Sequence, residues 1–297
     1  MRVLLSEYAG ACYGVERALS LVEKAAATEC CDLADGCIAR RVSTLGPLIH
    51  NPQVVAELER RGIHEAATVA EVADTRGGIL VIRSHGVTPD VIEEAEARGL
   101  VVVDATCPHV SKAQAAAREL REQGMSVLVV GETGHPEVES ISAHAGGDVL
   151  VVQEPDDLPK QMPGQETGIV VQTTQAPAAL DAIVNELKRR GIKPHVRNTI
   201  CSATLKRQQS AEALAHTVDA MVVVGGRNSG NTTRLTQICS AVTPATYHIE
   251  TPDELNPEWF IGLESVGVTA GASTPQKQID AVVQLLSCIA DRIANES

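Results

Sequence analysis

The chain has 297 residues, of which 44% are hydrophobic and 21% charged, a composition typical of a folded protein of two or three domains. Only 2% of the residues are aromatic and the net charge is −13, which argues against nucleic acid and anionic lipid as partners. The first residues lack the apolar core and cleavage site of a signal peptide, and no stretch approaches ~18 uninterrupted apolar residues. We therefore expect a cytoplasmic protein without a membrane span.

The first third of the chain opens with an apolar run, RVLLSEYAGA, that leads into Cys12. A helical pattern follows, with apolar residues on one face at Val15, Leu19, Val22 and Ala26. Two further predicted strands each run into a glycine- or proline-bounded loop that carries a histidine: His50 in RVSTLGPLIHN and His85 in ILVIRSHGVTP.

The second third repeats this order. The run LVVVDAT precedes Cys107, and a helix with an apolar face at Val110, Ala113, Ala117 and Leu120 follows it. The next strand and loop, VLVVGETGHPE, contain His135 and Glu137, and GIVVQTTQAP contains Thr173.

The last third has the same pattern again. HVRNTI precedes Cys201, MVVVGGRNSGN carries Ser229 and Asn231, and VGVTAGASTP carries Ser273. Strands alternate with helices throughout, which predicts βαβ units, parallel sheets and an α/β fold with ligands at the carboxyl ends of strands.

Cys12, Cys107 and Cys201 stand at matching positions in the three thirds, which predicts three similar α/β units around a pseudo-threefold axis. We expect the units at 13–107, 108–200 and 201–297, with the N-terminal strand, 1–12, packed on the last unit. Three thiolates at one point would suit either zinc or a [4Fe–4S] cluster, and counting alone does not decide between them. The alternative for each cysteine is a small buried hydrophobe.

The other five cysteines are interpreted as structural. Cys30, Cys31 and Cys37 cluster in TECCDLADGC, which could indicate another metal site. Because the other thirds have no equivalent, the stretch is interpreted as a helix end and a surface loop. Cys239 and Cys288 lie on apolar helical faces and are expected to pack in the core.

The polar loops could together bind an anion. The three loop histidines and the hydroxyl and amide side chains would form a compact cage at helix N-termini, although each of the small side chains could also serve as a helix cap. Glu137 is the one carboxylate in this group of loops, and could either carry protons or interact with a helix dipole.

The motifs ACYGVERA, GPLIHN, RSHGV, DATCPHVSK, GHPEVE, QTT, NTICSATLKRQ, GGRNSGNTTRL and GVTAGAST occur in this order along nearly the whole chain. Together they resemble the 4-hydroxy-3-methylbut-2-enyl diphosphate reductases, the LytB/IspH family of the non-mevalonate isoprenoid pathway. The resemblance implies reductive dehydroxylation of that allylic diphosphate to isopentenyl and dimethylallyl diphosphate.

The resemblance also implies the site. Cys12, Cys107 and Cys201 match the ligands of an oxygen-sensitive [4Fe–4S] cluster whose fourth iron binds the substrate hydroxyl, and Glu137 matches the acid that delivers protons. The substrate-binding positions of the family match seven residues here: His50, His85, His135, Thr173, Ser229, Asn231 and Ser273. Ferredoxin or flavodoxin is the implied electron donor, and the basic stretch 187–193 is a candidate docking patch, although basic residues at a helix end more often interact with its dipole.

Two departures from the family pattern are visible. Gly230 stands where many members have a second serine, which puts one diphosphate contact in doubt, and Ser140 stands for a glycine, which we expect to be a local turn adjustment. Rival interpretations are a quinolinate-synthase-like [4Fe–4S] dehydratase, a Cys₃ zinc hydrolase and a non-enzymatic redox sensor.

Overall fold

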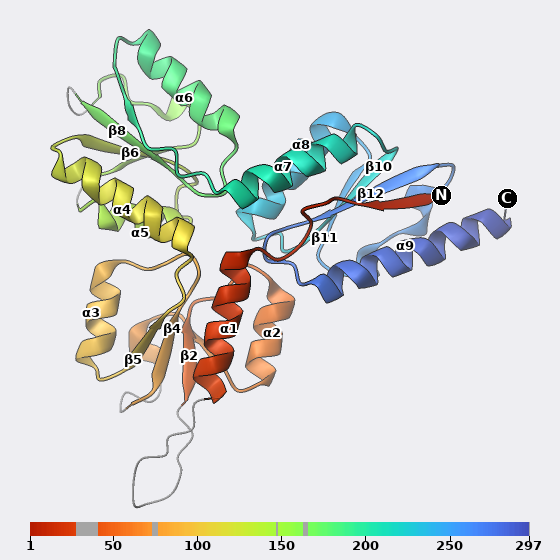
Figure 1. The fold of residues 1–297 in the computed structure, drawn as a ribbon, viewed down its shortest axis with the longest axis horizontal. Coiled ribbons are helices and arrows are strands. Elements are labelled where there is room, and N and C mark those ends of the chain that lie inside the picture. The colour runs from red at the N-terminus through yellow and green to blue at the C-terminus, as the bar shows by residue number, and fades with distance from the viewer. Residues whose placement is uncertain (28–40, 73–76, 147, 163–165, 297) are drawn as a thin grey trace, which may run out of the picture. The chain divides into compact units, whose positions relative to one another are not determined.

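The computed structural model describes residues 1–27, 41–72, 77–146, 148–162 and 166–296 (Figure 1). Cys30, Cys31 and Cys37, which the sequence assigns to a helix end and surface loop, lie outside these described residues. None of the helices within the described ranges is both long and apolar enough to cross a membrane.

The described strands form three four-stranded sheets in which every pairing is parallel, which confirms the predicted α/β class. The first sheet has the order β3-β2-β4-β5 and the second has the order β7-β6-β8-β9. The strands of these two sheets are β2 (Val42–Leu45), β3 (His64–Ala66), β4 (Ile79–Ile82), β5 (Val101–Asp104), β6 (Ser126–Val130), β7 (Leu150–Val152), β8 (Thr167–Val171) and β9 (His195–Val196).

The third sheet has the order β1-β12-β10-β11, and its strands come from both ends of the chain. They are β1 (Arg2–Leu5), β10 (Ala220–Val224), β11 (Thr246–Ile249) and β12 (Ser265–Ala270). β1 pairs with β12 so that Arg2 lies opposite Ser265. Seen from β11, the third sheet therefore repeats the order of the other two, with β1 in the place of β5 and β9.

The central strands are buried along nearly their whole length, whereas the edge strands β1, β5 and β9 are largely exposed. This follows from the sequence, because runs such as VLVV and MVVV are apolar on both faces, as strands covered by helices on both sides require. One core cluster includes Val222, Phe260, Val268 and Leu286. This cluster packs α9 (Gln276–Glu296) against the third sheet.

Each of the three matched cysteines is followed directly by a helix, as predicted: α1 (Tyr13–Ala27), α4 (Pro108–Glu122) and α7 (Ser202–Ala215). Five helices begin with proline, whose fixed φ suits the first turn. The remaining helices are α2 (Pro52–Arg60), α3 (Pro89–Ala97), α5 (Pro136–His144), α6 (Pro177–Arg189) and α8 (Gly230–Val242), with 3₁₀ turns η1 (Val69–Glu71), η2 (Pro155–Asp157), η3 (Pro252–Glu254) and η4 (Pro257–Phe260).

Contacts divide the chain into two compact units. Unit 1 comprises residues 1–13, 50–52 and 201–297 and contains the third sheet; unit 2 comprises 14–49 and 53–200 and contains the first and second sheets. The division at 107/108 and 200/201 into three domains stays a prediction.

The core prediction is confirmed for Cys239, which is fully buried, and is wrong for Cys288, which is exposed. The buried face of α9 is formed by Ile279, Val282, Leu286 and Ile289 at helical spacing. Cys288 is two residues past Leu286, about 200° around the helix, so that it points away from this face.

Candidate functional site

The three matched cysteines form no disulfide bond and lie at the starts of helices. Cys107 and Cys201 are the N-cap residues of α4 and α7, and Cys12 immediately precedes α1. Their loops are fixed by the backbone, since the Cys12 N–H donates to the Ala272 carbonyl at 3.0 Å and the Cys107 N–H donates to the Ser84 carbonyl at 2.9 Å. A helix N-terminus favours the thiolate, which is the form that binds metals.

Cys12 and Cys201 belong to unit 1, whereas Cys107 belongs to unit 2. Within neither unit do the described residues gather three or more His, Cys, Asp or Glu side chains in positions to hold a metal ion. Each unit by itself therefore presents only part of the predicted ligand set.

A buried arginine provides a test of whether unit 1 suits a negatively charged metal–thiolate group. Arg207 on α7 is only 4% exposed, and its Nε has no hydrogen-bond partner in the part of the chain that the structure describes. Burial lowers the pKa of Arg207 below its ordinary value, and the Cys12 and Cys201 thiolates act in the opposite direction. A buried cation beside two cysteines fits a group that carries negative charge.

In unit 2, the carboxyl group of Glu137 is enclosed and held. Glu137 is in the first turn of α5 and is 2% exposed. The Thr173 backbone N–H donates to its Oε1 at 2.6 Å, and the Thr173 hydroxyl donates to its Oε2 at 2.9 Å. Two predicted site residues, from the loops after β6 and β8, are thus in direct contact.

Burial raises the pKa of Glu137 from 4.5 to about 7, because desolvation outweighs the two hydrogen bonds from Thr173, which lower the pKa. The nearby charge of Glu132 adds a smaller upward contribution. A carboxyl group that titrates near neutral pH can both give and take a proton there, which suits a general acid.

Two of the predicted histidines, His85 and His135, lie near the start of α5, the helix that carries Glu137. The rings of His85 and His135 meet edge to face with centroids 5.5 Å apart. His135 is the N-cap of α5, and its Nδ1 accepts the Glu137 backbone N–H at 3.1 Å. In a neutral imidazole that accepts at Nδ1, the proton is on Nε2, so His135 is a hydrogen-bond donor at Nε2.

Ser140 does not form a turn, and that expectation is wrong. It lies inside α5, is 1% exposed, donates its hydroxyl to the Val87 carbonyl at 3.1 Å and accepts from Gln114 Nε2 at 2.6 Å. Gly86, the residue after His85, has φ +73°, and a Cβ there would lie 2.5 Å from Gln114 Nε2 and 2.8 Å from Ser140 Oγ. Ser140 therefore joins α5 to the loop of His85, as a buried hydroxyl in a helix with two available partners can.

In unit 1, the start of α8 carries two predicted residues with different surroundings. Ser229 is the N-cap, and its hydroxyl accepts the Thr232 N–H at 3.4 Å. Asn231 is 4% exposed, and neither atom of its amide has a hydrogen-bond partner among the described residues. Gly230, which stands at the usual serine position, is the first residue of the helix. An unsatisfied buried amide at a helix N-terminus fits an anionic ligand.

The remaining predicted residues of unit 1 lie beside this helix start. The Ser273 hydroxyl donates to the His50 carbonyl at 2.9 Å. A Cβ on Gly226 would lie 2.9 Å from the same carbonyl and 2.7 Å from Asn228 Oδ1, so only glycine fits there. The loops after β10 and β12 and residue 50 thus come together in unit 1, at the carboxyl ends of strands, as the sequence predicts.

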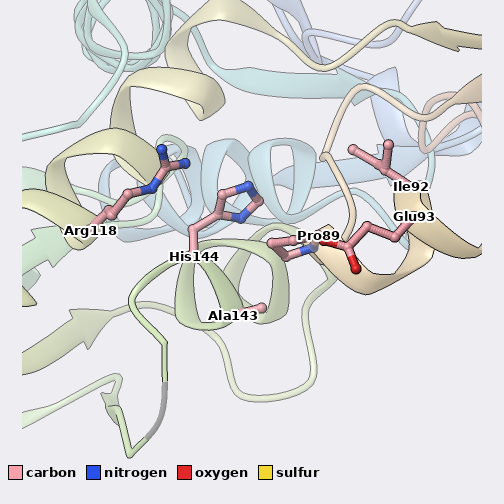
Figure 2. Close-up of a pocket in the computed structure, with 6 residues that line it drawn as sticks. All are labelled: Pro89, Ile92, Glu93, Arg118, Ala143 and His144. Atoms are coloured by element: carbon pink, nitrogen blue, oxygen red, sulfur yellow. The ribbon is translucent and has the colours of Figure 1, made fainter.

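A separate surface pocket of about 370 Å³ lies between α3, α4 and α5 in unit 2. Figure 2 shows His144 of α5 between Arg118 of α4 and the α3 residues. The lining residues are Pro89, Ile92, Glu93, Arg118, Ala143 and His144, none of which is a predicted site residue.

Two features of the site were not found from the sequence. Arg207 lies in the quoted motif NTICSATLKRQ, but a single arginine in a helix gives no signal of burial. Its one available sign was its place on α7, six residues after Cys201. The contact of Gln114 with Ser140 joins residues 26 positions apart, and no pattern in the sequence indicates it.

The fold and site define a class: an α/β protein with parallel sheets, helix-start cysteines, a buried neutral-range carboxyl group and an anion-suited helix start, all at the carboxyl ends of strands. The model of the LytB protein family matches residues 3–287, and the chain belongs to this family.

Individual relatives agree. The 4-hydroxy-3-methylbut-2-enyl diphosphate reductase of Geobacter metallireducens is 45% identical over 96% of both chains. A solved structure of (E)-4-hydroxy-3-methyl-but-2-enyl diphosphate reductase, described as the terminal enzyme of the non-mevalonate pathway, is 39% identical, covers 97% of this chain and 99% of its own, and has a TM-score of 0.69. The structure of the E-1-hydroxy-2-methyl-but-2-enyl-4-diphosphate reductase from Plasmodium falciparum shares the fold, with a TM-score of 0.88. It is 24% identical in sequence, and the match covers 96% of this chain and 87% of the Plasmodium chain.

Proposed function

We propose that this chain reduces 4-hydroxy-3-methylbut-2-enyl diphosphate to isopentenyl and dimethylallyl diphosphate, the last step of the non-mevalonate isoprenoid pathway. The observation that carries the proposal is the 45% identity, over 96% of both chains, to a reductase of that name. The reaction consumes two electrons and two protons and releases the hydroxyl group as water.

The cofactor proposed is a [4Fe–4S] cluster held by Cys12, Cys107 and Cys201. The positions of these cysteines at helix starts and the buried cation Arg207 support a cluster that carries negative charge. When bound, the cluster supplies the electrons and a substrate-accessible iron. A reducing compartment suits these thiols, so the cytoplasm is the proposed location. The proposed electron donor is ferredoxin or flavodoxin, as the family resemblance implies.

Seven residues are proposed to bind the substrate, chiefly at its diphosphate: His50, Ser229, Asn231 and Ser273 in unit 1, and His85, His135 and Thr173 in unit 2. With a net charge of −13, the protein must hold a diphosphate by local donors. The unsatisfied amide of Asn231 at the start of α8 and the Nε2 proton of His135 are two such donors.

Glu137 is the proposed proton donor. Its pKa of about 7 keeps a large fraction of the carboxyl group protonated at neutral pH, and the Thr173 hydrogen bonds fix its position. A proton delivered to the substrate hydroxyl makes water the leaving group. The carboxylate that results keeps both hydrogen bonds from Thr173, which stabilises it in a buried place.

The test is made without oxygen. Protein purified anaerobically should be brown, contain close to four irons per chain, and convert the hydroxylated allylic diphosphate with a chemical reductant into both five-carbon diphosphates. Replacement of Cys107 with serine should lower the iron content. A colourless zinc protein would contradict the redox reaction, and a brown protein that leaves this substrate unchanged would favour a quinolinate-synthase-like dehydratase or a sensor.

A further inference from the structure

One buried side chain in unit 1 connects the backbones next to two of the cysteines. Arg207 Nη2 donates to the Gly10 carbonyl at 2.7 Å, and Nη1 donates to the Ala203 carbonyl at 3.3 Å. Gly10 is two residues before Cys12, and Ala203 is two residues after Cys201. The rigid fork of the guanidinium thus fixes the loop of Cys12 against the first turn of α7.

The charge of Arg207 has no carboxylate to balance it. Among the described residues, no Asp or Glu forms an ion pair with Arg207, whereas Arg189, Arg190 and Arg227 all have such partners at the surface. Isolated burial of a cation costs several kcal/mol in general, so a buried arginine is expected beside negative charge. In unit 1 the ionisable groups that act on Arg207 are the thiols of Cys12 and Cys201.

We propose that Arg207 is a positioning residue that holds the Cys12 loop and, as a fixed positive charge, makes the cluster easier to reduce. This inference rests on the proposed cluster and goes beyond the proposed function. Each electron that enters the cluster adds a negative charge, and a cation in a poorly solvated place stabilises that charge more than one at the surface.

The neighbouring residue provides a matched control. Lys206 is on the same helix and has the same charge, but it is exposed, and its ammonium group lies 5.6 Å from the Tyr8 ring centroid. Solvent screens a charge in that place. Lys206→Gln and Arg207→Gln therefore remove one positive charge each and differ in burial.

The experiment is a redox titration of the iron–sulfur protein, followed by electron paramagnetic resonance, for wild type, Arg207→Gln, Arg207→Lys and Lys206→Gln. We expect a more negative midpoint potential in Arg207→Gln, a smaller shift in Arg207→Lys because the charge remains, and almost none in Lys206→Gln. Urea unfolding of the four apoproteins measures the loss of the Gly10 hydrogen bond separately.

An unchanged potential in Arg207→Gln, or equal shifts in the Gln and Lys variants, would overturn the role of charge. If Arg207→Gln does not retain iron, Arg207→Lys decides: normal iron content and a near-normal potential support the proposal, and loss of iron in both variants contradicts it. A wild-type protein with no iron–sulfur cluster overturns the proposed cofactor as well. A wild-type protein that turns over normally beside an Arg207→Gln variant of unchanged potential overturns this inference alone.

Discussion

The loops at the starts of α5 and α8 occupy equivalent places in two sheets and differ in how their polar groups are satisfied. Each follows the strand next to the sheet edge, β6 or β10, and each helix has a predicted site residue at its second position, Glu137 or Asn231. Glu137 receives two hydrogen bonds from Thr173, in the loop after the neighbouring strand β8. Asn231 receives none from the described residues, and Ser273, in the loop after β12, donates to the His50 carbonyl instead.

The difference separates two tasks. In unit 2, the hydrogen bonds from Thr173 to Glu137 form within the protein. The Glu137 carboxyl group therefore has a fixed position and a raised pKa before any ligand binds. The amide in unit 1 is incomplete, so that a ligand would supply its missing partners. We infer that the α5 loop serves proton transfer and the α8 loop serves binding, and variants of the two should affect different kinetic constants.

The largest effect is expected for Glu137→Gln, which removes the proton and keeps the shape. General acids contribute ~10²–10⁴-fold in rate, so turnover should fall at least ~10²-fold while KM changes little. Anaerobic steady-state kinetics measures both constants. Glu139→Gln is the control, since Glu139 is exposed two residues further along the same helix. Near-normal turnover in Glu137→Gln would rule out the proton-donor role.

Asn231→Ala should have the opposite signature. A hydrogen bond to a charged group contributes about 1.5–3 kcal/mol, so KM should rise roughly 10- to 100-fold while kcat stays within a few-fold of wild type. The same assay applies, with Thr233→Ala as the control at an exposed position of α8. If kcat falls and KM does not change, the division of tasks between the two loops is wrong.

Ser140→Ala tests the support beneath the α5 loop. Loss of the hydroxyl leaves the Val87 carbonyl and the Gln114 amide without this partner, which should lower the free energy of unfolding by about 1–3 kcal/mol. Urea denaturation of the apoprotein measures this. Ser142→Ala is the matched control, because the Ser142 hydroxyl, on the same helix, has no hydrogen-bond partner among the described residues. Equal losses of unfolding free energy in the two variants would show that the hydrogen bonds of Ser140 to Val87 and Gln114 do not contribute to stability.

Thr173→Val should produce the smallest change, in pH dependence. The protonated acid is active, so kcat/KM should fall as pH rises through about 7 in the wild type. The Thr173 hydroxyl stabilises the carboxylate, and its loss should raise the pKa of Glu137 and move the alkaline limb upward by about one unit. A pH profile of kcat/KM tests this, and a downward move would contradict it.

Much of the fold was predictable because each strand and its loop are local in sequence. Apolar runs predicted the strands, and helical patterns after the three matched cysteines predicted helices, so that the α/β class and the strand-end loops followed. The contact between Glu137 and Thr173 spans 36 positions and depends on β6 and β8 being neighbours, which periodicity does not reveal. The predicted roles of the site residues remain to be tested by the variants above.

The failures have physical causes. The replacement of a family glycine by Ser140 predicts only a local turn adjustment, whereas the hydroxyl has two buried partners from distant segments. Cys288 was assigned to the core from nearby apolar residues, although helical geometry turns it away from the sheet. Arg207 was not noticed, since burial of a charge depends on tertiary surroundings that one sequence position does not encode.

The pairing of β1 with β12 has a consequence for synthesis. Arg2 lies opposite Ser265, so β1 is made ~260 residues before its partner strand, a separation that slows folding. The Cys12 N–H likewise donates to the Ala272 carbonyl. During translation, the Cys12 loop lacks this partner until the segment that contains Ala272 has been made. A chain cut before β12 therefore lacks both the partner strand of β1 and the hydrogen bond that holds the Cys12 loop.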